Sequence, residues 1–354
     1  MKQELNRQIV SYLKQNQPLS QPSEFQVSPL SPDGSDRIYY RITAPRVASF
    51  IATDASGCSR KEVPTGLSQN NSFRIIQQHL EKLGFPVPKF LAPKFANDEL
   101  YLLQDLGNIT LYNFVKQHGW CNKTIAIYRN VLTLLLRLQT EAAETFNPDW
   151  AYAGGFYNHE LIVERELNYF LKAFIIDYCK IKVNDSERTL LTTEFTLLAD
   201  SAMQAPANFF LYRDFQSKNL MLHRGEIFLI DFQGARLGPC YYDLAALIND
   251  PYTEIPLTLR SELKEHFFAE LKVVEGKAVP EMTTFDHYFS IFSLIRTLQT
   301  LGAFGYLSQR GKKHFTQYIR PALTNLDYYL SKLNHDNQNF NLSILGSICN
   351  KVEL

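Results

Sequence analysis

The sequence predicts an α+β fold of two lobes, with a small β-rich lobe at the N-terminus and a larger, mostly helical lobe at the C-terminus. Short apolar runs separated by polar turns dominate the first 105 residues, which is typical of strands. Beyond residue 106, apolar residues recur mostly at the three- and four-residue spacing of helices. The length of 354 residues fits two domains or one large two-lobed unit. We therefore expect lobes at residues 1–105 and 106–354, connected near residues 104–107.

The N-terminal lobe is expected to contain strands and one clear helix. Each strand candidate is a short apolar run bounded by polar or Gly-containing turns. The helix has apolar residues at helical spacing from Phe73 to Leu83, and Gly84 ends it. The expected strands cover residues 27–30, 38–42, 48–53 and 100–103, and the expected helix covers residues 73–83.

The C-terminal lobe is expected to be built from helices. The run from Val131 to Leu138 is apolar almost all round, which indicates a central helix. The Asn-rich tail from Asn334 onward is only weakly patterned. The expected helices cover residues 111–117, 123–141, 160–180, 186–204, 257–274 and 285–301.

The composition excludes several classes of protein. The 36 basic and 36 acidic residues give a formal net charge of zero, which disfavours a nucleic-acid partner. The five cysteines are widely spaced and form no C-x-x-C pair, so we expect reduced thiols without a disulfide framework or a zinc site. The polar, amphipathic start is no signal peptide, and no apolar run is long enough to span a membrane. We therefore expect a cytoplasmic chain without a membrane partner, and the oligomeric state stays open.

The stretch from Phe209 to Asp250 predicts the chemistry. An apolar run ends just before Asp214, Asn219 follows five residues later, and a second apolar run at 227–230 ends in Asp231. Phosphoryl transfer requires positioning and neutralisation of charge, with oxygen ligands for Mg²⁺ and a base for the acceptor hydroxyl. We expect Asp214 to be that base and Asn219 and Asp231 to be the Mg²⁺ ligands. Each residue is ordinary by itself, and the order of the features favours this interpretation.

Two N-terminal segments are candidates for binding a nucleotide. The turn before Ile38 contains Gly34, and its backbone together with Ser35 and Arg37 can contact phosphate oxygens, although a simple hairpin loop fits equally well. The segment that connects the lobes offers its backbone at Gln104 and Leu106 to adenine.

The strand at residues 48–53 has no lysine, although many kinases carry a phosphate-pairing lysine there. Arg37, Arg41 or Lys61 can supply this charge, and nothing in the sequence selects among them.

The acceptor is expected to bind in the helical lobe. Arg296 and Gln299 lie one helical turn apart in an apolar stretch, so both can point into a pocket, or both can lie on the surface. Glu164 and Glu166 are further candidates, with solvent-exposed positions as the favoured alternative.

The central pattern resembles the D-x-x-x-x-N…D-F-G arrangement of the protein kinases, with Asp231-Phe232-Gln233 in place of the last triplet. It is more similar to the aminoglycoside phosphotransferase and choline kinase family, in which a Gly-Pro turn and an Asp-Leu-Ala follow. Within it, the chain resembles the bacterial anomeric kinases of N-acetylmuramate and N-acetylglucosamine. The resemblance to this branch is carried by residues 34–39, 212–219, 230–234 and 296–303, and the resemblance to the wider family also by residues 238–239 and 243–245.

The resemblance implies a protein kinase-like fold and an ATP- and Mg²⁺-dependent kinase of a small hydroxylated metabolite, with an amino sugar as the expected acceptor. It also implies that Asp243 supports the catalytic loop by hydrogen bonds. Aminoglycosides and choline-like alcohols stay open as acceptors, although no dense acidic cluster favours a polycation. The missing strand lysine keeps a non-catalytic nucleotide-binding adaptor as an alternative. A protein substrate is disfavoured, because only eleven residues separate Asp231 from Asp243.

Overall fold

The computed structural model describes residues 6–7, 9–12, 25–30, 37–45, 47–54, 67–91, 100–276, 279–336 and 340–352. The chain forms two compact units, and each takes its residues from three stretches. The β-rich unit consists of residues 1–110, 146–155 and 219–235, and the helical unit consists of residues 111–145, 156–218 and 236–354. The chain first passes from one unit to the other after Thr110. The boundary that we expected at residue 105 stays a prediction.

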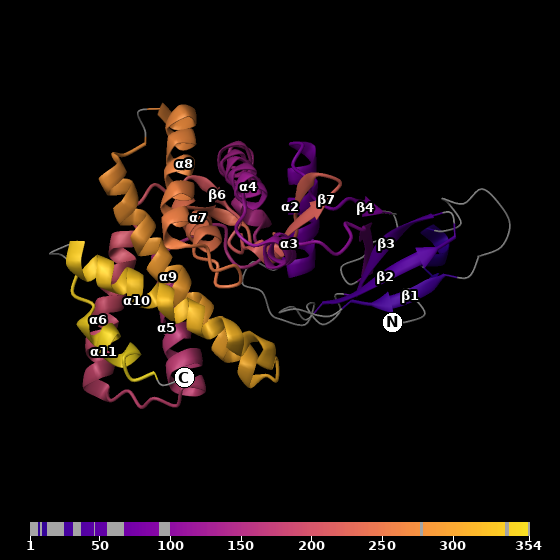
Figure 1. Cartoon of the computed structure of the whole chain (residues 1–354). Coiled ribbons are helices and arrows are strands. Elements are labelled where there is room, and N and C mark those ends of the chain that lie inside the picture. Colours follow the sequence, from indigo (N-terminus) through magenta and orange to yellow (C-terminus); the bar gives the residue numbers. More distant parts are fainter. Residues whose placement is uncertain are drawn as a thin grey trace. The chain divides into compact units, whose positions relative to one another are not determined.

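A five-stranded antiparallel sheet forms the frame of the β-rich unit, with the strands in the order β1-β2-β3-β5-β4 (Figure 1). One cluster of buried residues, Ile9, Ile42, Phe50, Ala52 and Leu102, fixes the register of β2, β3 and β5, because a slip by one residue would turn these side chains to the other face. The strands are β1 (Gln26–Pro29), β2 (Ile38–Ala44), β3 (Val47–Asp54), β4 (Phe90–Leu91) and β5 (Leu100–Gln104).

Helix α2 (Gln69–Lys82) belongs to the same unit and begins four residues before the expected start. The Ser68 hydroxyl accepts a hydrogen bond from the Asn71 N–H at 3.1 Å and caps the helix. Because residues 69–72 are all polar, the apolar spacing could not reveal this first turn. The helix buries Phe73, Ile76 and Leu80 and gives way to Gly84, whose φ of +78° suits a residue without Cβ.

A two-stranded hairpin completes the β-rich unit. Strands β7 (Leu220–His223) and β8 (Glu226–Leu229) pair with Leu220 opposite Leu229. The Leu222 N–H donates to the carbonyl of Ile109 at 2.7 Å, and the Leu229 N–H donates to that of Pro86 at 2.8 Å. These two backbone bonds fasten the hairpin to segments that lie more than a hundred residues away in the sequence.

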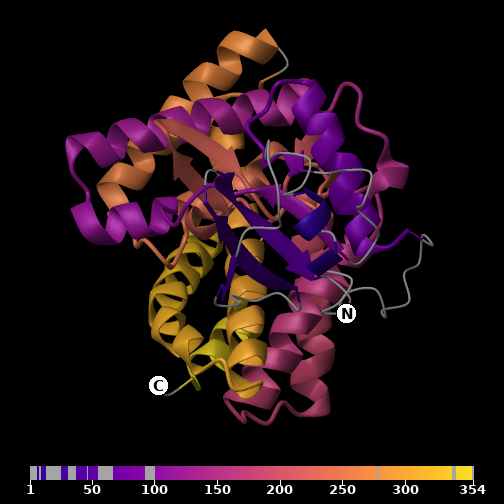
Figure 2. The same ribbon diagram turned by 90° about the vertical axis from the view of Figure 1, so that its right-hand side faces the viewer.

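The helical unit is organised around one long helix, α9 (Met282–Gln309), which contacts α5, α6, α7 and α10 (Figures 1 and 2). The strands β6 (Phe209–Leu211) and β9 (Arg236–Gly238) pair antiparallel in this unit. The remaining helices are α3 (Leu111–His118), α4 (Asn122–Glu141), α5 (Asn168–Phe170), α6 (Asp185–Ala202), α7 (Cys240–Ile248), α8 (Leu257–Glu275), α10 (Ile319–Asp336) and α11 (Ser343–Cys349).

Two π-helical segments, η3 (Leu161–Leu167) and η4 (Leu171–Tyr178), flank the short α5. Helix α9 packs against them closely at Gly302 and Gly305. A Cβ on Gly302 would lie 2.9 Å from the Tyr169 ring, and one on Gly305 would lie 2.8 Å from the Ala173 carbonyl. Glycine is required at both positions because the two backbones approach so closely.

The α+β fold class with a small β-rich part and a larger helical part is confirmed. The expected strands and helices are present with ends shifted by up to eight residues, except that the expected helix at residues 160–180 is two π-helical segments around a short α-helix. The sequence pattern missed β4, β9, α10 and α11. The N-terminal turn of α11 is held by Glu194, whose carboxylate accepts from the N–H groups of Ile344 and Leu345 at 2.8 Å each.

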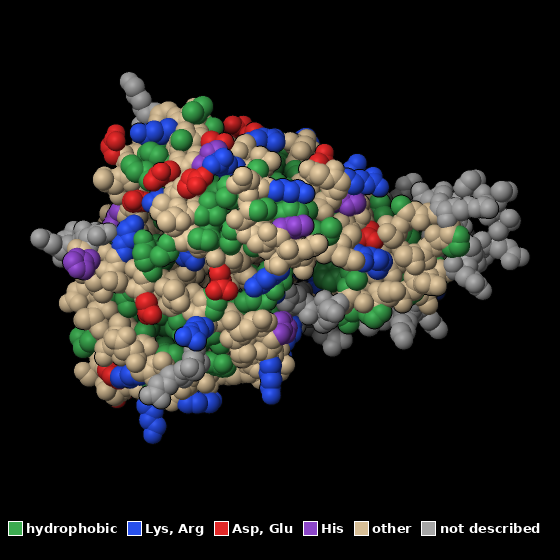
Figure 3. All heavy atoms as spheres, viewed as in Figure 1, with side chains coloured by type: hydrophobic (Ala, Val, Ile, Leu, Met, Phe, Trp, Pro, Cys, Tyr) green, Lys and Arg blue, Asp and Glu red, His purple; other side chains and the backbone are tan. Residues whose placement is uncertain are grey.

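Positive and negative side chains are mixed over the face of the helical unit drawn in Figure 3, in keeping with the net charge of zero. Among the described residues, no helix is both long and apolar enough to cross a lipid bilayer.

Candidate active site

The hairpin in the β-rich unit positions Asn219 and Asp231 at one end. The Ile230 N–H donates to the carbonyl of Asn219 at 3.1 Å, so the residues next to the paired strands lie side by side. Asp231 has a φ of +68°, a conformation that Asp tolerates better than most residues and that turns its side chain out of the strand direction. Both side chains offer oxygen atoms, which are the ligands that Mg²⁺ prefers.

The environment of Asp231 fixes its carboxylate. Phe232 is fully buried and stacks on Phe73 of α2, with ring centroids 4.8 Å apart. The Gln233 amide donates to Asp231 Oδ1 at 2.6 Å, and Arg37 Nη1 lies 3.8 Å from the same oxygen. The Asp231 side chain nevertheless stays 37% exposed. The anchored neighbour and the accessible carboxylate together suit a ligand for a hard cation.

Arg37 is buried at the start of β2, only 2% exposed. The side-chain oxygen of Asn70 accepts hydrogen bonds from its guanidinium. Two other residues considered for the nucleotide phosphates, Ser35 and Lys61, lie outside the described residues.

The segment after β5 has a specific pattern of backbone hydrogen bonds. The Gln104 N–H donates to the carbonyl of Lys89 at 2.9 Å, and the carbonyl of Leu106 lies 3.0 Å from Nδ1 of His223. Leu106 is only 6% exposed, yet no residue in the described ranges accepts a hydrogen bond from its N–H. Because buried backbone N–H groups are nearly always paired, this donor is suited to a ligand such as a purine ring.

Asp214 lies in the helical unit, in the loop after β6. The two preceding backbone N–H groups, of Tyr212 and Arg213, donate to the carboxylate of Asp243 at 2.6 and 2.8 Å. Arg213 has a φ of +81°, a strained conformation that these bonds help to hold. Asp243 is fully buried in α7, and burial raises its pKa to about 7 against the opposing effect of the two N–H donors.

A second buried carboxylate, which the sequence analysis missed, holds the same loop further along. Asp250 accepts hydrogen bonds from the N–H of Ser217 at 2.8 Å and from the N–H of Tyr252 at 2.9 Å. Burial raises its pKa. Asp243 and Asp250 therefore fix the loop on both sides of Asp214.

Arg296 of α9 contacts Asp214 directly. Its Nη2 lies 3.3 Å from Asp214 Oδ1, and its Nη1 donates to the side-chain oxygen of Gln299 one turn later. Arg296 is only 7% exposed, and Nε has no hydrogen-bond partner among the described residues. The helix thus places Arg296 and Gln299 together beside Asp214, and the alternative of surface positions is wrong for Arg296.

Glu166 is fully buried, so the solvent-exposed position that we favoured for it is wrong. The hydroxyls of Tyr157 and Tyr242 donate to its two oxygens at 2.6 and 2.8 Å, which compensates for the loss of water. Burial raises its pKa. Glu164 is exposed, which agrees with the solvent-exposed position that was the favoured alternative. The guanidinium of Arg296 lies 5.7 Å from the centre of the Tyr242 ring, which connects Glu166 to the surroundings of Asp214.

Lys218, also missed by the sequence analysis, inserts its ammonium group among aromatic rings. Its Nζ lies 4.2 Å from the ring centre of Tyr252. The other rings lie 5.2 to 5.5 Å away and belong to Tyr112, Phe315 and Tyr318. We call these four rings the aromatic cage of Lys218. Lys218 belongs to the same loop as Asp214, so the cage holds that loop against the helices.

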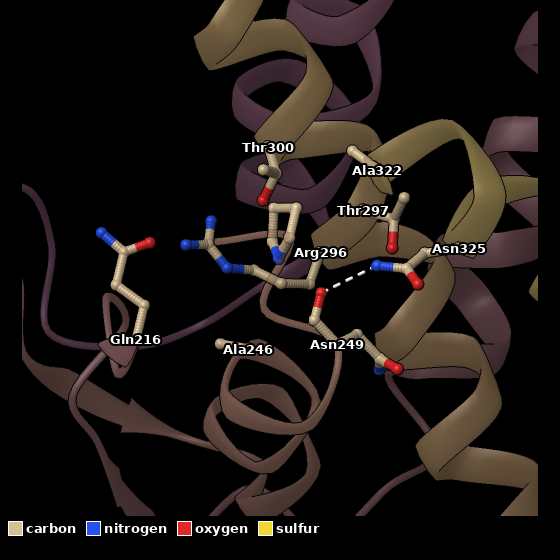
Figure 4. A pocket seen from close by; sticks show the side chains of 9 residues that line it. Gln216, Ala246, Asn249, Arg296, Thr297, Thr300, Ala322 and Asn325 are labelled. Atoms are coloured by element: carbon tan, nitrogen blue, oxygen red, sulfur yellow. Dashed lines mark hydrogen bonds between the residues drawn. The ribbon is translucent and has the colours of Figure 1, made fainter. Parts of the chain in front are cut away.

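A pocket that opens to solvent adjoins Arg296 (Figure 4). In the close view, the guanidinium of Arg296 extends from α9 towards Gln216, with Thr300 one turn further along the helix. The Asn325 amide donates to the carbonyl of Asn249 at 2.8 Å and closes one side. The described residues that line it include no carboxylate; they are Gln216, Ala246, Asn249, Pro251, Arg296, Thr297, Thr300, Ala322 and Asn325.

These features define a class of protein. Residues 26–276 match the model of the phosphotransferase enzyme family, and the chain therefore belongs to this family. It is a small-molecule kinase, as the resemblance in the sequence implied.

The chain is similar in sequence to a kinase of known substrate and in fold to kinases of known structure. The chain is 26% identical over 315 residues to the N-acetylmuramate/N-acetylglucosamine kinase of Neisseria meningitidis serogroup B, covering 88% of this chain and 86% of the relative. Its fold is similar to that of choline kinase from Cryptosporidium parvum, with a TM-score of 0.61, 14% identity and 97% of each chain covered. It is also similar to the amicoumacin kinase hAmiN in complex with AMP-PNP, Ca²⁺ and Ami, with a TM-score of 0.56, 14% identity and 98% of each chain covered. These likenesses confirm the kinase-like fold.

Proposed function

We propose that this chain transfers the γ-phosphate of ATP to a hydroxyl group of an amino sugar of the N-acetylmuramate or N-acetylglucosamine type, with Mg²⁺ as the metal. The observation that carries the proposal is the contact between Arg296 and Asp214. It brings a carboxylate suited to be a base close to a pocket lined by amides, hydroxyls and the guanidinium of Arg296.

The β-rich unit supplies the groups for the nucleotide. The N–H of Leu106 would bind adenine, because this buried residue donates it to no acceptor among the described residues. Asn219 and Asp231 would hold Mg²⁺, since both offer oxygen donors at one end of the same hairpin. The metal would neutralise the charge that develops on the phosphate oxygens. The solved structure of hAmiN, whose fold is similar, contains AMP-PNP and Ca²⁺ and so supports a nucleotide and a divalent cation as ligands.

The helical unit supplies the groups for the acceptor. Asp214 accepts the proton of the attacking hydroxyl, and the loop that carries it is held by Asp243, Asp250 and the aromatic cage of Lys218. Glu166 supports the site through Tyr242, and we no longer place it among the residues that contact the acceptor. Arg296 and Gln299 orient the acceptor.

The lining of the pocket supports an amino sugar. Amides, hydroxyls and one guanidinium can pair with the hydroxyls, the acetamido group and the carboxylate of such sugars. A polycationic aminoglycoside would place its charges near Arg296, which is unfavourable. The relative in Neisseria meningitidis is named as a kinase of these two sugars. A choline-type alcohol is the second candidate, because the choline kinase shares the fold.

Release of ADP with different acceptors tests the proposal. N-acetylmuramate, N-acetylglucosamine, choline and an aminoglycoside are each added to the protein with ATP and Mg²⁺, and ADP is measured by a coupled reaction. We expect turnover with one or both amino sugars. Turnover with choline or the aminoglycoside alone would overturn the acceptor class. Binding of ATP without turnover on any acceptor would favour the non-catalytic adaptor.

A further inference from the structure

Strand β3 carries no lysine, so the cation for the nucleotide phosphates must come from another position. In protein kinases a lysine on this strand is held by a glutamate of the following helix. The sequence offers Arg37, Arg41 and Lys61 as substitutes, and two of these lie in the described ranges. The contacts of Arg37 and Arg41 distinguish between them.

The guanidinium of Arg41 forms its hydrogen bonds with the segment after β5. Its Nε and Nη2 donate to the two carboxylate oxygens of Asp105 at 2.7 and 2.9 Å. The same guanidinium also donates to the carbonyl of Gly107 at 2.9 Å and to the side chain of Asn108 at 2.6 Å. A bidentate ion pair of this kind neutralises the charge and fixes the geometry. Arg41 therefore shapes the segment that would bind adenine.

Arg37 has contacts of a different kind. Its Nε and Nη2 lie 3.3 and 3.2 Å from Asn70 Oδ1, a neutral acceptor in the first turn of α2. Its Nη1 lies 3.8 Å from Asp231 Oδ1. The guanidinium also lies 5.8 Å from the centre of the Phe73 ring, on which Phe232 stacks. Helix, aromatic pair and Asp231 thus fix one buried cation beside the expected Mg²⁺ ligand.

We infer that Arg37, oriented by Asn70, replaces the strand lysine and binds the phosphates of the nucleotide. The inference deepens the proposed function and rests on it for the identity of the nucleotide. In place of the glutamate of other kinases, the neutral amide of Asn70 orients the guanidinium, and the carboxylate that pairs with it is that of Asp231, the expected Mg²⁺ ligand. Arginine suits this place because its planar fork matches phosphate oxygens.

Binding of a graded set of nucleotides tests the inference without turnover. Affinities for ATP, ADP, AMP and adenosine are measured by calorimetry, in Mg²⁺ and again in EDTA, for the native protein and for Arg37→Met. We expect Arg37→Met to lower the affinity for ATP and ADP at least tenfold and the affinity for adenosine less than twofold, in both buffers. Because EDTA removes the contribution of Asn219 and Asp231, the loss in EDTA belongs to the arginine.

Three further variants separate a phosphate contact from a change of structure. Arg41→Met should lower the affinities for adenosine and ATP by the same factor, since the substitution acts on the segment that would bind adenine. Arg74→Met, whose guanidinium contacts Asn71 on its own helix, should leave all affinities within twofold. Asn70→Asp places a carboxylate next to Arg37, which is still present. It should lower the affinity for ATP at least fivefold relative to the affinity for adenosine.

Unchanged ATP affinity in Arg37→Met would overturn the inference, and so would an equal loss for adenosine and ATP. If Arg37→Met does not fold, Asn70→Asp and Arg37→Lys decide the question by the same ratio of affinities. A failure of the proposed acceptor would show in the ADP assay and would leave these binding ratios unaffected, so the two failures can be told apart.

Discussion

The guanidinium of Arg296 lies 3.3 Å from the carboxylate of Asp214, measured between Nη2 and Oδ1. Arg296 also lines the pocket of the helical unit, so one buried side chain contacts both the expected base and the expected acceptor site. A positive charge at this point can orient the carboxylate, and the Nε of Arg296 is buried without a hydrogen-bond partner among the described residues.

Asp214→Asn should abolish turnover and leave nucleotide binding nearly intact. The amide cannot accept the proton of the acceptor hydroxyl, and a positioned base contributes roughly 10²- to 10⁴-fold to the rate. Turnover is measured by ADP release and ATP affinity by calorimetry. Asp200→Asn is the control, because it removes only a surface pair with His159 and should change neither value. A fully active Asp214→Asn protein would remove the assignment of the base.

Arg296→Met should lower kcat/KM for the acceptor by about tenfold or more and leave the KM for ATP unchanged. Removing one partner of a buried charge pair is costly, because the other charge is left without compensation. Arg296→Lys should recover only part of the loss, since lysine lacks the planar fork. Arg310→Met on the same helix, which loses an exposed contact with Tyr306, is the control. Equal changes in the KM values of acceptor and ATP would contradict the assignment of the pocket.

Lys218→Met should lower the melting temperature and the rate together. Contacts between a cation and several partly desolvated rings stabilise by roughly 1–2 kcal/mol, whereas a single exposed contact contributes less. Lys123 lies 5.4 Å from the ring centre of Phe114, which is not one of the cage rings, so Lys123→Met is the matched control. Thermal unfolding and ADP release are both measured. If the two variants melt at the same temperature, the aromatic cage does not hold the loop.

The native protein should lose stability as the pH rises from about 4 towards 7. Burial raises the pKa of Glu166 and raises that of Asp243 to about 7, whereas unfolded carboxyl groups titrate near pH 4. In this range the folded chain binds more protons than the unfolded chain, so raising the pH favours unfolding. Denaturant titrations across the range measure the slope. Glu166→Gln should flatten it by the contribution of one carboxyl group, and an unchanged slope would contradict the expected titration of Glu166.

The sequence predicted most of the long elements, with α10 as the exception, and missed the shortest strands. Helices such as α4 and α9 span several turns, so their apolar spacing is visible. The two residues of β4 and the three of β9 are too short to show any period. The π-helical segments η3 and η4 were not predicted either, since helical spacing does not distinguish them from an α-helix. For this reason the burial of Glu166 could not be foreseen.

In the candidate site, the order of polar residues around two apolar runs was enough to select Asp214, Asn219 and Asp231, whose roles stay predictions. Residues that act through distant partners gave no such signal. Lys218 meets Phe315 and Tyr318 about a hundred residues further along the chain, and no local pattern connects them. Arg37 could be selected over Arg41 only when their partners Asn70 and Asp105 were known.

The passage of the chain between its two units has a consequence for protein engineering. Residues 1–110 form only part of the β-rich unit, and the hairpin that carries Asn219 and Asp231 comes from residues 219–235. A fragment cut after Thr110 would therefore lack both expected metal ligands and the partners of Pro86 and Ile109. Neither unit can be expressed by itself as one uninterrupted piece of the gene.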